Sequence, residues 1–186
     1  MTNYEPGQDR NVAALNILFM CDGFLIMKKL TTEEKFMSLA LKEARKAEAL
    51  DEVPIGCVIV KDNVVIAKGF NHKESKNDVT SHAEIEAIRK ASKKLNNWRL
   101  VDCDLYVTIE PCIMCMGAIA QSYIRTIYFG AKDRKGGAAV SSINYLEVPG
   151  LNHYPRIEEG LLEEECSELV KKYFRNKREN KKIKLG

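Results

Sequence analysis

The sequence predicts an α/β fold, in which helices cover a β-sheet, from two observations. Four runs with strand character alternate with segments of helical periodicity, and these runs are residues 55–60, 64–70, 105–109 and 126–129. Strands that alternate with helices form a sheet that the helices bury. The chain also has 186 residues with 45% hydrophobic content, which is enough apolar material for one domain with a sizeable core.

The first helix is expected to begin after Thr31 and to reach about Leu50. Thr31 and Glu34 have the spacing of a capping box, and the apolar residues that follow keep a helical period. The next two strand-like runs flank Asp62-Asn63, a two-residue connection that predicts a β-hairpin. Residues 71–80 are polar and are predicted to form a loop.

A second helix is expected from His82, with Ser81 as its N-cap. The third strand-like run leads into Pro111, and proline fits the first turn of a helix, whose early amides have no carbonyl partner. That helix is expected to reach about Tyr123. The last helix starts near Glu163, and its apolar first half should pack on the domain while its basic second half should face a partner.

Residues 1–27 are predicted to be an N-terminal extension of unknown role, and residues 28–186 to be the functional domain. Residues 12–27 are apolar, but they are interrupted and fall short of the roughly 20 residues of a membrane span. Acidic residues precede this run and no small-residue cleavage site follows, so neither a signal peptide nor membrane insertion is expected.

Positive charge is concentrated at the C-terminal end. Residues 171–184 hold eight Lys or Arg against the single acid Glu179, whereas the rest of the chain has 21 basic and 25 acidic residues. This localised excess indicates a polyanionic partner such as nucleic acid. Six cysteines in a chain of this length suit a reducing cytoplasm better than a disulfide scaffold, and Cys57, Cys103 and Cys166 are expected to be buried thiols.

The remaining pattern predicts a catalytic zinc site. Cys112 and Cys115 are three residues apart near the start of a helix, so their sulfurs share one face beside unpaired amides that favour the thiolate. His82 offers a third ligand of a type that zinc accepts. Because three protein ligands leave one position for water, we expect one zinc ion that activates a hydroxide as the nucleophile.

Glu84 is predicted to be the proton shuttle of this site, because His-x-Glu with Pro-Cys-x-x-Cys is the pattern of zinc nucleobase deaminases. Two other interpretations stay open. With Ser81 as N-cap, Glu84 also has the position of a capping-box glutamate. Cys112 and Cys115 also have the spacing of a thioredoxin-like redox pair, although that interpretation leaves the His-x-Glu pair unexplained.

With these residues in place, the sequence resembles the bacterial tRNA-specific adenosine deaminases of the cytidine deaminase-like superfamily. The agreement runs from about Lys35 to the C-terminal helix. It covers Val53-Pro54-Ile55-Gly56, Gly69-Phe70-Asn71, His82-Ala83-Glu84, Tyr106 to Cys112, Cys115, Gly130-Ala131-Lys132-Asp133, Gly137-Ala138-Ala139 and Asn152-His153.

This resemblance implies a three-layer α/β/α sandwich with a five-stranded mixed sheet and a homodimer with one zinc ion in each subunit. It also implies that adenosine becomes inosine at the wobble position of a tRNA anticodon stem-loop, with Asn71 bonding the flipped base. Pro54 and Ile55 would wall the pocket, and Asp133 would lie near the sugar of the preceding nucleotide. A strand entry and a loop turn are the plain structural interpretations of these last three residues.

The basic tail fits an RNA loop, whose bases leave the stack at lower cost than those of a duplex. Its cations can meet phosphates while neighbouring aromatic residues pack or stack, although a frayed, solvated helix end would have the same composition. The residues expected to contact RNA are Lys171, Lys172, Arg175, Lys177 and Arg178.

Two other functions stay open. A deaminase of a free base, nucleoside or nucleotide, such as guanine, cytosine or a deoxycytidylate, would share the zinc pattern but would have no use for the basic tail. A zinc-stabilised RNA-binding or regulatory subunit without turnover would not need Glu84. Because the composition and the motifs favour neither alternative, we predict a cytoplasmic, zinc-dependent tRNA adenosine deaminase.

Overall fold

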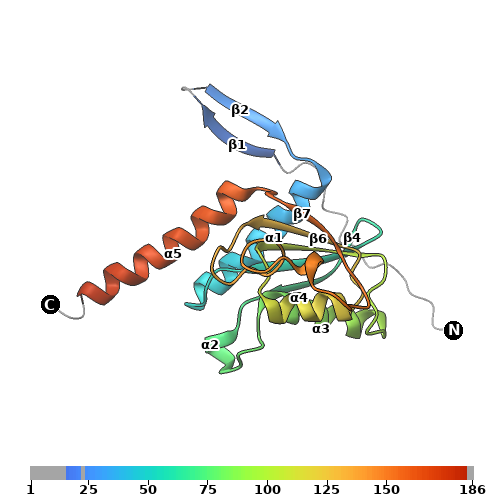
Figure 1. The fold of residues 1–186 in the computed structure, drawn as a ribbon. Coiled ribbons are helices and arrows are strands. Elements are labelled where there is room, and N and C mark those ends of the chain that lie inside the picture. Colours follow the sequence, from blue (N-terminus) through green and yellow to red (C-terminus); the bar gives the residue numbers. More distant parts are fainter. Residues whose placement is uncertain (1–15, 22–23, 184–186) are drawn as a thin grey trace.

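The computed structural model describes residues 16–21 and 24–183, and its central feature is a sheet with helices on both faces (Figure 1). The strands of this sheet are β3 (Gly56–Lys61), β4 (Val64–Phe70), β5 (Cys103–Ile109), β6 (Thr126–Ala131) and β7 (Arg156–Glu159). The helices are α1 (Thr32–Ala49), α2 (Lys73–Lys76), α3 (Ala83–Leu95), α4 (Ile113–Gln121) and α5 (Glu163–Ile183), with a 3-10 turn at Tyr145–Glu147.

The sheet has five strands in the order β4-β3-β5-β6-β7 and mixed directions. β3 pairs antiparallel with β4 and with β5, whereas β5, β6 and β7 run parallel. The five-stranded mixed sheet expected from the family resemblance is therefore confirmed. The central strand β5 delivers the chain directly to the start of α4.

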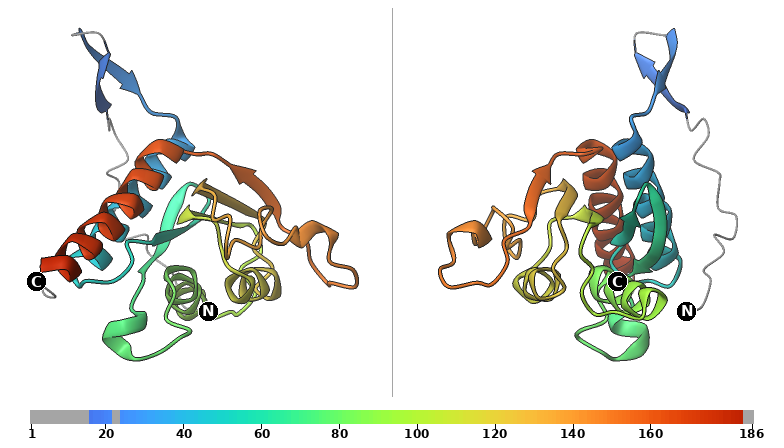
Figure 2. Two further views of the ribbon diagram at one scale, coloured as in Figure 1. Left: turned by 60° about the vertical axis from the view of Figure 1, so that its left-hand side comes forward. Right: turned by 90° about the vertical axis from the view of Figure 1, so that its right-hand side faces the viewer.

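The two faces of the sheet carry different pairs of helices, which makes the fold a three-layer α/β/α sandwich (Figure 2). Successive side chains of a strand point to opposite faces, and β5 illustrates this. Leu105 belongs to the buried cluster formed with α3 and α4, and Tyr106 belongs to the cluster formed with α1 and α5. The helices that carry His82 and Cys112 therefore lie on the same face of the sheet.

The predicted local signals of the first helix and of the hairpin are confirmed. The Thr31 hydroxyl accepts a hydrogen bond from the Glu34 amide at 3.1 Å, and the Glu34 carboxylate accepts one from the Thr31 amide at 2.8 Å. Asp62 and Asn63, between β3 and β4, have φ angles of 49° and 60°. Both lie in the left-handed region that a two-residue hairpin turn of this kind requires.

Three elements differ from the sequence-based expectations. Residues 73–76 form the short helix α2 inside the segment predicted as a polar loop. Residues 156–159 form β7, although Arg-Ile-Glu-Glu has little strand character, because they pair parallel with the edge of β6. The helix after β5 begins at Ile113 with Cys112 as its N-cap, so Pro111 precedes the helix instead of lying in its first turn.

Before α1, the chain forms a two-stranded antiparallel hairpin of β1 (Asn16–Cys21) and β2 (Phe24–Lys29). It extends away from the sandwich in Figures 1 and 2. The expected end of the extension, after residue 27, falls within β2, and the assignment of residues 1–27 to an extension stays a prediction. Across the described residues, no helix has the length and apolar character needed to span a bilayer.

Candidate active site

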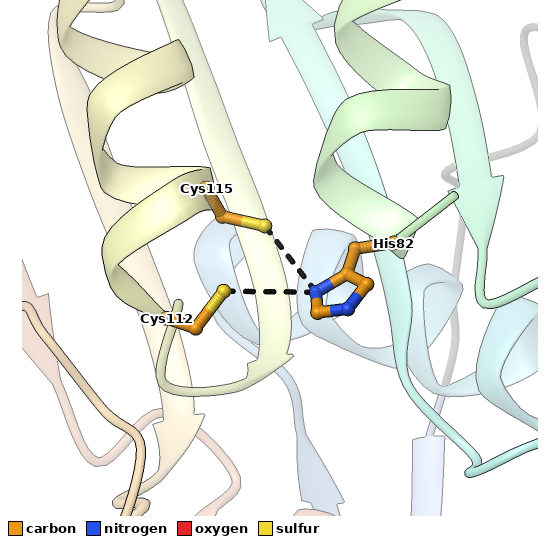
Figure 3. A group of neighbouring side chains, drawn as sticks. All are labelled: His82, Cys112 and Cys115. Atoms are coloured by element: carbon orange, nitrogen blue, oxygen red, sulfur yellow. Dashed lines mark hydrogen bonds between the residues drawn. The ribbon is translucent and has the colours of Figure 1, made fainter. Parts of the chain in front are cut away.

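His82 and Cys112 are the N-cap residues of α3 and α4, so two helices begin at the same point (Figure 3). The Nδ1 atom of His82 lies 3.7 Å from the sulfur of Cys112 and 3.6 Å from the sulfur of Cys115. Gly69 of β4 lets α3 approach the sheet, because a Cβ there would lie 2.2 Å from the Ala83 carbonyl oxygen. The predicted triad is therefore brought together.

The spacing of these three ligand atoms fits a tetrahedral metal ion. Zinc takes nitrogen at about 2.0–2.1 Å and sulfur at about 2.3 Å, which places the two ligand atoms about 3.5 Å apart in a tetrahedral site. All three ligand atoms lie within 4.8 Å of one another, and no other such group is found in the described part of the chain. His72 and His153 do not belong to this group, and the His153 ring contacts the Ile124 carbonyl oxygen.

Hydrogen bonds between the ligands separate the pKa values of the two thiols. The hydrogen bond from Cys115, together with the contact to His82, lowers the pKa of Cys112 from 9.0 to about 4. The same hydrogen bond, with burial, raises the pKa of Cys115. The pKa of His82 is raised, chiefly by its hydrogen bond with Cys112. A thiolate at this position is a ready ligand for a soft or borderline cation.

Glu84 lies in the first turn of α3 and is 4% exposed. Burial raises the pKa of its carboxyl group from 4.5 to about 7. Because the N-cap is His82 and not Ser81, Glu84 is not at the third helical position, so the structure does not contain the capping box that was its alternative interpretation. A buried carboxyl group that lies two residues from a predicted metal ligand and has no capping role is typical of a catalytic acid or base.

The prediction that Ser81 caps α3 is wrong, because two acids beside it engage its hydroxyl. The Ser81 hydroxyl donates to Asp78 at 2.8 Å and lies 3.2 Å from Glu86. The first helical amide, that of Ala83, instead donates to the Asn71 side-chain oxygen at 3.0 Å. The cap therefore comes from a residue on another segment, which local sequence spacing could not indicate.

Asn71 is buried and joins the start of α3 to the entry of β3. Its backbone amide donates to the Ile55 carbonyl at 3.1 Å, while its Oδ1 atom holds the Ala83 amide. The Oδ1 atom is thus occupied, and the Nδ2 amide is the part of this side chain left to donate to a ligand. Pro54 is buried and Ile55 half-buried beside it, so the structure brings these three predicted pocket residues together.

Asp133 follows β6, in a loop for which both a turn and a substrate contact were expected from the sequence. Its Oδ1 atom accepts hydrogen bonds from the amides of Lys135 and Gly136, at 3.0 Å and 3.2 Å. The turn is therefore present, and the substrate role stays a prediction. Glu110, which was only part of a motif in the sequence, accepts the amide of Asp133 at 3.1 Å.

The basic tail continues α5 and borders an open cleft of about 600 Å³. This cleft is lined by residues 50–53, which follow α1, by Asn71 and α2, and by Tyr173, Phe174 and Lys177 of α5. Lys177 forms an ion pair with Asp51, and Arg175 forms one with Glu168 at 2.9 Å. Lys171, Lys172 and Arg178 are exposed. All five predicted tail residues are exposed; within the described residues Arg175 and Lys177 form ion pairs, whereas Lys171, Lys172 and Arg178 form none.

The fold and the site together define a nucleobase deaminase of the cytidine deaminase-like class, in which the His-x-Glu helix meets the Pro-Cys-x-x-Cys helix. Residues 31–178 match the model of the MafB19-like deaminase family, and the chain belongs to this family.

Relatives within this class are close. A tRNA-specific adenosine deaminase of Agrobacterium fabrum is 50% identical over 143 residues, which cover 77% of this chain and 94% of the relative. A tRNA-specific adenosine deaminase of Haemophilus influenzae is 45% identical over 152 residues, which cover 81% of this chain and 88% of the relative. A structure solved in a study of A-to-I editing by tRNA:A34 deaminases at the wobble position has a TM-score of 0.70 and 50% identity, covering 72% and 97%. Guanine deaminase from Bacillus subtilis has a TM-score of 0.53 and 34% identity, covering 77% and 93%.

Proposed function

We propose that this protein deaminates adenosine to inosine at the wobble position of tRNA, with zinc as its cofactor. The observation that carries the proposal is the convergence of His82, Cys112 and Cys115 at two helix N-termini, two residues from the buried Glu84. Relatives named tRNA-specific adenosine deaminase support the substrate, because they match this chain over nearly their whole length.

His82, Cys112 and Cys115 would hold the zinc ion, which would act as a Lewis acid and lower the pKa of a water molecule to about 7. Glu84 transfers the protons. It takes one proton from the attacking water and gives it to nitrogen 1 of adenine. It then takes the second proton from the hydroxyl group added to carbon 6 and passes it to the amine, which leaves as ammonia. Burial suits this role, because a carboxyl group with a pKa near neutrality can both accept and donate a proton.

The base is proposed to enter beside Asn71. The Nδ2 amide of Asn71 can donate to a ring acceptor while its Oδ1 atom still accepts the hydrogen bond from the Ala83 amide at the start of α3. Pro54 and Ile55 would give an apolar wall, as the strand entry beside Asn71 suggests. Asp133 would contact the sugar of the preceding nucleotide. Each of these groups belongs to a backbone segment fixed by hydrogen bonds, which favours a preorganised pocket.

The RNA is proposed to follow the cleft from Asn71 toward α5. Asn71 and Phe174 line the same cleft, and Phe174 is 43% exposed, so an unstacked base can reach an aromatic surface there. The exposed cations Lys171, Lys172 and Arg178 can then meet phosphates. Since Arg175 and Lys177 are paired within the chain, we expect them to contribute less to RNA binding.

A cytoplasmic homodimer is also part of the proposal. α4 carries no charged residue, and Ile113 at its start is 52% exposed. An uncharged, partly exposed apolar helix favours contact with another protein surface, and a second copy of the chain would supply one. Sedimentation of the zinc-loaded protein tests this point, and a monomer at micromolar concentration would contradict it.

A second candidate, deamination of free guanine, is favoured by the similarity to guanine deaminase from Bacillus subtilis. The purified protein should therefore be offered three substrates in parallel: an anticodon stem-loop with adenine at the wobble position, free adenosine and free guanine. We expect inosine in the stem-loop and no product from the free compounds. Xanthine from guanine, with an unchanged stem-loop, would replace the proposed function by the second candidate.

A further inference from the structure

Glu110 organises the loop that follows β6. It is 4% exposed and lies between β5 and Cys112. Its Oε1 atom accepts hydrogen bonds from the amides of Val140 and Ser141, at 2.8 Å and 2.9 Å. Its Oε2 atom accepts one from the amide of Asp133 at 3.1 Å and one from the Ser141 hydroxyl. One buried carboxylate thus holds both ends of the segment 133–141.

The same segment is attached through its backbone to residues 111 and 112, which lie between β5 and α4. Gly137 forms a β-bridge with Cys112, and the amide of Ala138 donates to the Pro111 carbonyl at 2.8 Å. A Cβ atom on Gly137 would lie 2.4 Å from the Glu110 carboxyl group, so only glycine permits this approach. Glu110 and Gly137 therefore connect the loop to the segment between β5 and α4 that contains Cys112.

The charge of Glu110 is balanced by donors and not by a cation. No ion pair is found for it within residues 29–181, and three of its four donors are backbone amides. Hydrogen bonds from fixed amides to an ionised carboxylate are stronger than those between neutral groups. A backbone amide cannot turn to become an acceptor, so this arrangement accepts a carboxylate and rejects an amide.

We propose that Glu110 is a positioning residue, which holds the segment 133–141 beside Cys112 as the wall that binds the nucleotide next to the target base. This inference rests on the proposed function, because it needs an RNA substrate. It assigns Glu110 no part in the chemical step. Its removal should therefore weaken RNA binding while the metal and the proton shuttle stay in place.

The variant Glu110→Gln tests this role. In either orientation, the new NH₂ group faces at least one backbone amide that can only donate, whereas the shape of the side chain is kept. Gly137→Ala disturbs the same contact, because the added methyl group would meet the Glu110 carboxyl group. Ser141→Ala removes one of the four hydrogen bonds and should have a smaller effect. Glu43→Gln is the matched control, because Glu43 is also buried but pairs with Lys46 on α1.

The experiment measures kcat and KM for the anticodon stem-loop, the zinc content, and amide hydrogen exchange of each zinc-loaded variant. We expect Glu110→Gln and Gly137→Ala to raise KM about tenfold or more, with kcat within about threefold and full zinc content, since removal of one charged hydrogen bond is worth about a tenfold change. The amides of Val140 and Ser141 should exchange faster, whereas those of β3 should not. Glu43→Gln should match the unchanged protein.

Three results would overturn the inference. They are an unchanged KM in both Glu110→Gln and Gly137→Ala, loss of zinc from both variants, or a fall in kcat without a rise in KM. The unchanged protein, measured in the same series, separates this inference from the proposed function. If it forms no inosine in the stem-loop, the proposed function fails and the inference fails with it. If it does form inosine, the three results bear on Glu110 alone.

Discussion

His82 and Cys112 are both helix N-caps, and neither side chain caps its helix, because their ligand atoms face each other at 3.7 Å. An N-cap side chain that makes no capping bond forgoes about 1 kcal/mol of helix stability. The two side chains also bring a thiolate and an imidazole close together at positive helix ends. A cation bound between them would stabilise both helix starts and the strand connections that lead to them.

Metal removal should therefore lower stability as well as activity. We predict that chelation abolishes deamination and lowers the midpoint of thermal unfolding, and that Cys112→Ser does both without chelator, because oxygen is a poorer ligand than thiolate in this site. Atomic absorption should find one zinc ion per chain. Cys103→Ser, at a buried thiol outside the site, should keep the ion. Full activity of chelated protein would contradict the metal's role.

Asn71 has two separable roles, as a cap for α3 and as a donor to the base. In Asn71→Asp a carboxylate oxygen can still accept the Ala83 amide, but the Nδ2 donor is gone. We predict that the free energy of urea unfolding changes by less than about 1 kcal/mol, whereas kcat/KM falls about tenfold or more. Asn71→Ala should lose both stability and activity. If Asn71→Asp kept full activity, the side chain would be a structural cap alone.

The exposed tail cations should control the salt dependence of RNA binding. We predict that Lys171→Ala with Lys172→Ala weakens binding of the stem-loop and lowers the slope of log Kd against log salt by about 0.7 for each phosphate that the tail no longer neutralises. The control is Lys93→Ala with Lys94→Ala, which removes the same charge from the last turn of α3. Equal slopes for the two double variants would show that total charge, not the tail, attracts RNA.

Asp78 should link acid stability to the loop before His82. Hydrogen bonds from the side chain and amide of Thr80, and from Ser81, lower its pKa from 3.8 to about 2. Because the folded-state pKa is the lower one, its contribution is complete above pH 3.8 and disappears as the pH falls toward 2. We predict that the unfolding free energies of the unchanged protein and of Asp78→Asn differ at pH 6 and converge near pH 2. A constant difference would contradict this linkage.

Much of this fold follows from local patterns in the chain. The capping box at Thr31, the turn at Asp62-Asn63 and the strand that ends before Pro111 each depend on neighbours within a few residues, and the structure contains all three. The triad could also be predicted, because ligand type and spacing are set by the chemistry of the metal. Burial of three thiols was predicted from their places in or beside strand-like runs and on a helical face, and it is confirmed for Cys57, Cys103 and Cys166.

The features that sequence reasoning missed depend on long-range contacts. Ser81 was expected to cap α3, but the cap comes from Asn71 on another segment. The hydrogen-bond donors to Glu110 lie 23 to 31 residues away in the sequence, so no local pattern predicts them. β7 is polar and exists through its pairing with β6. In each case a tertiary contact decides the role of a residue whose neighbours suggest another.

The central claim is that Glu84 moves the proton when adenine is deaminated at this site. It is tested most directly by the rate of inosine formation at the wobble position of the stem-loop by Glu84→Gln, with the zinc content measured on the same sample. We predict that this rate falls about 100-fold or more at full zinc occupancy, because a positioned acid-base group contributes about 10²- to 10⁴-fold. The Glu43→Gln control should be fully active. Undiminished inosine formation by zinc-loaded Glu84→Gln would contradict the account.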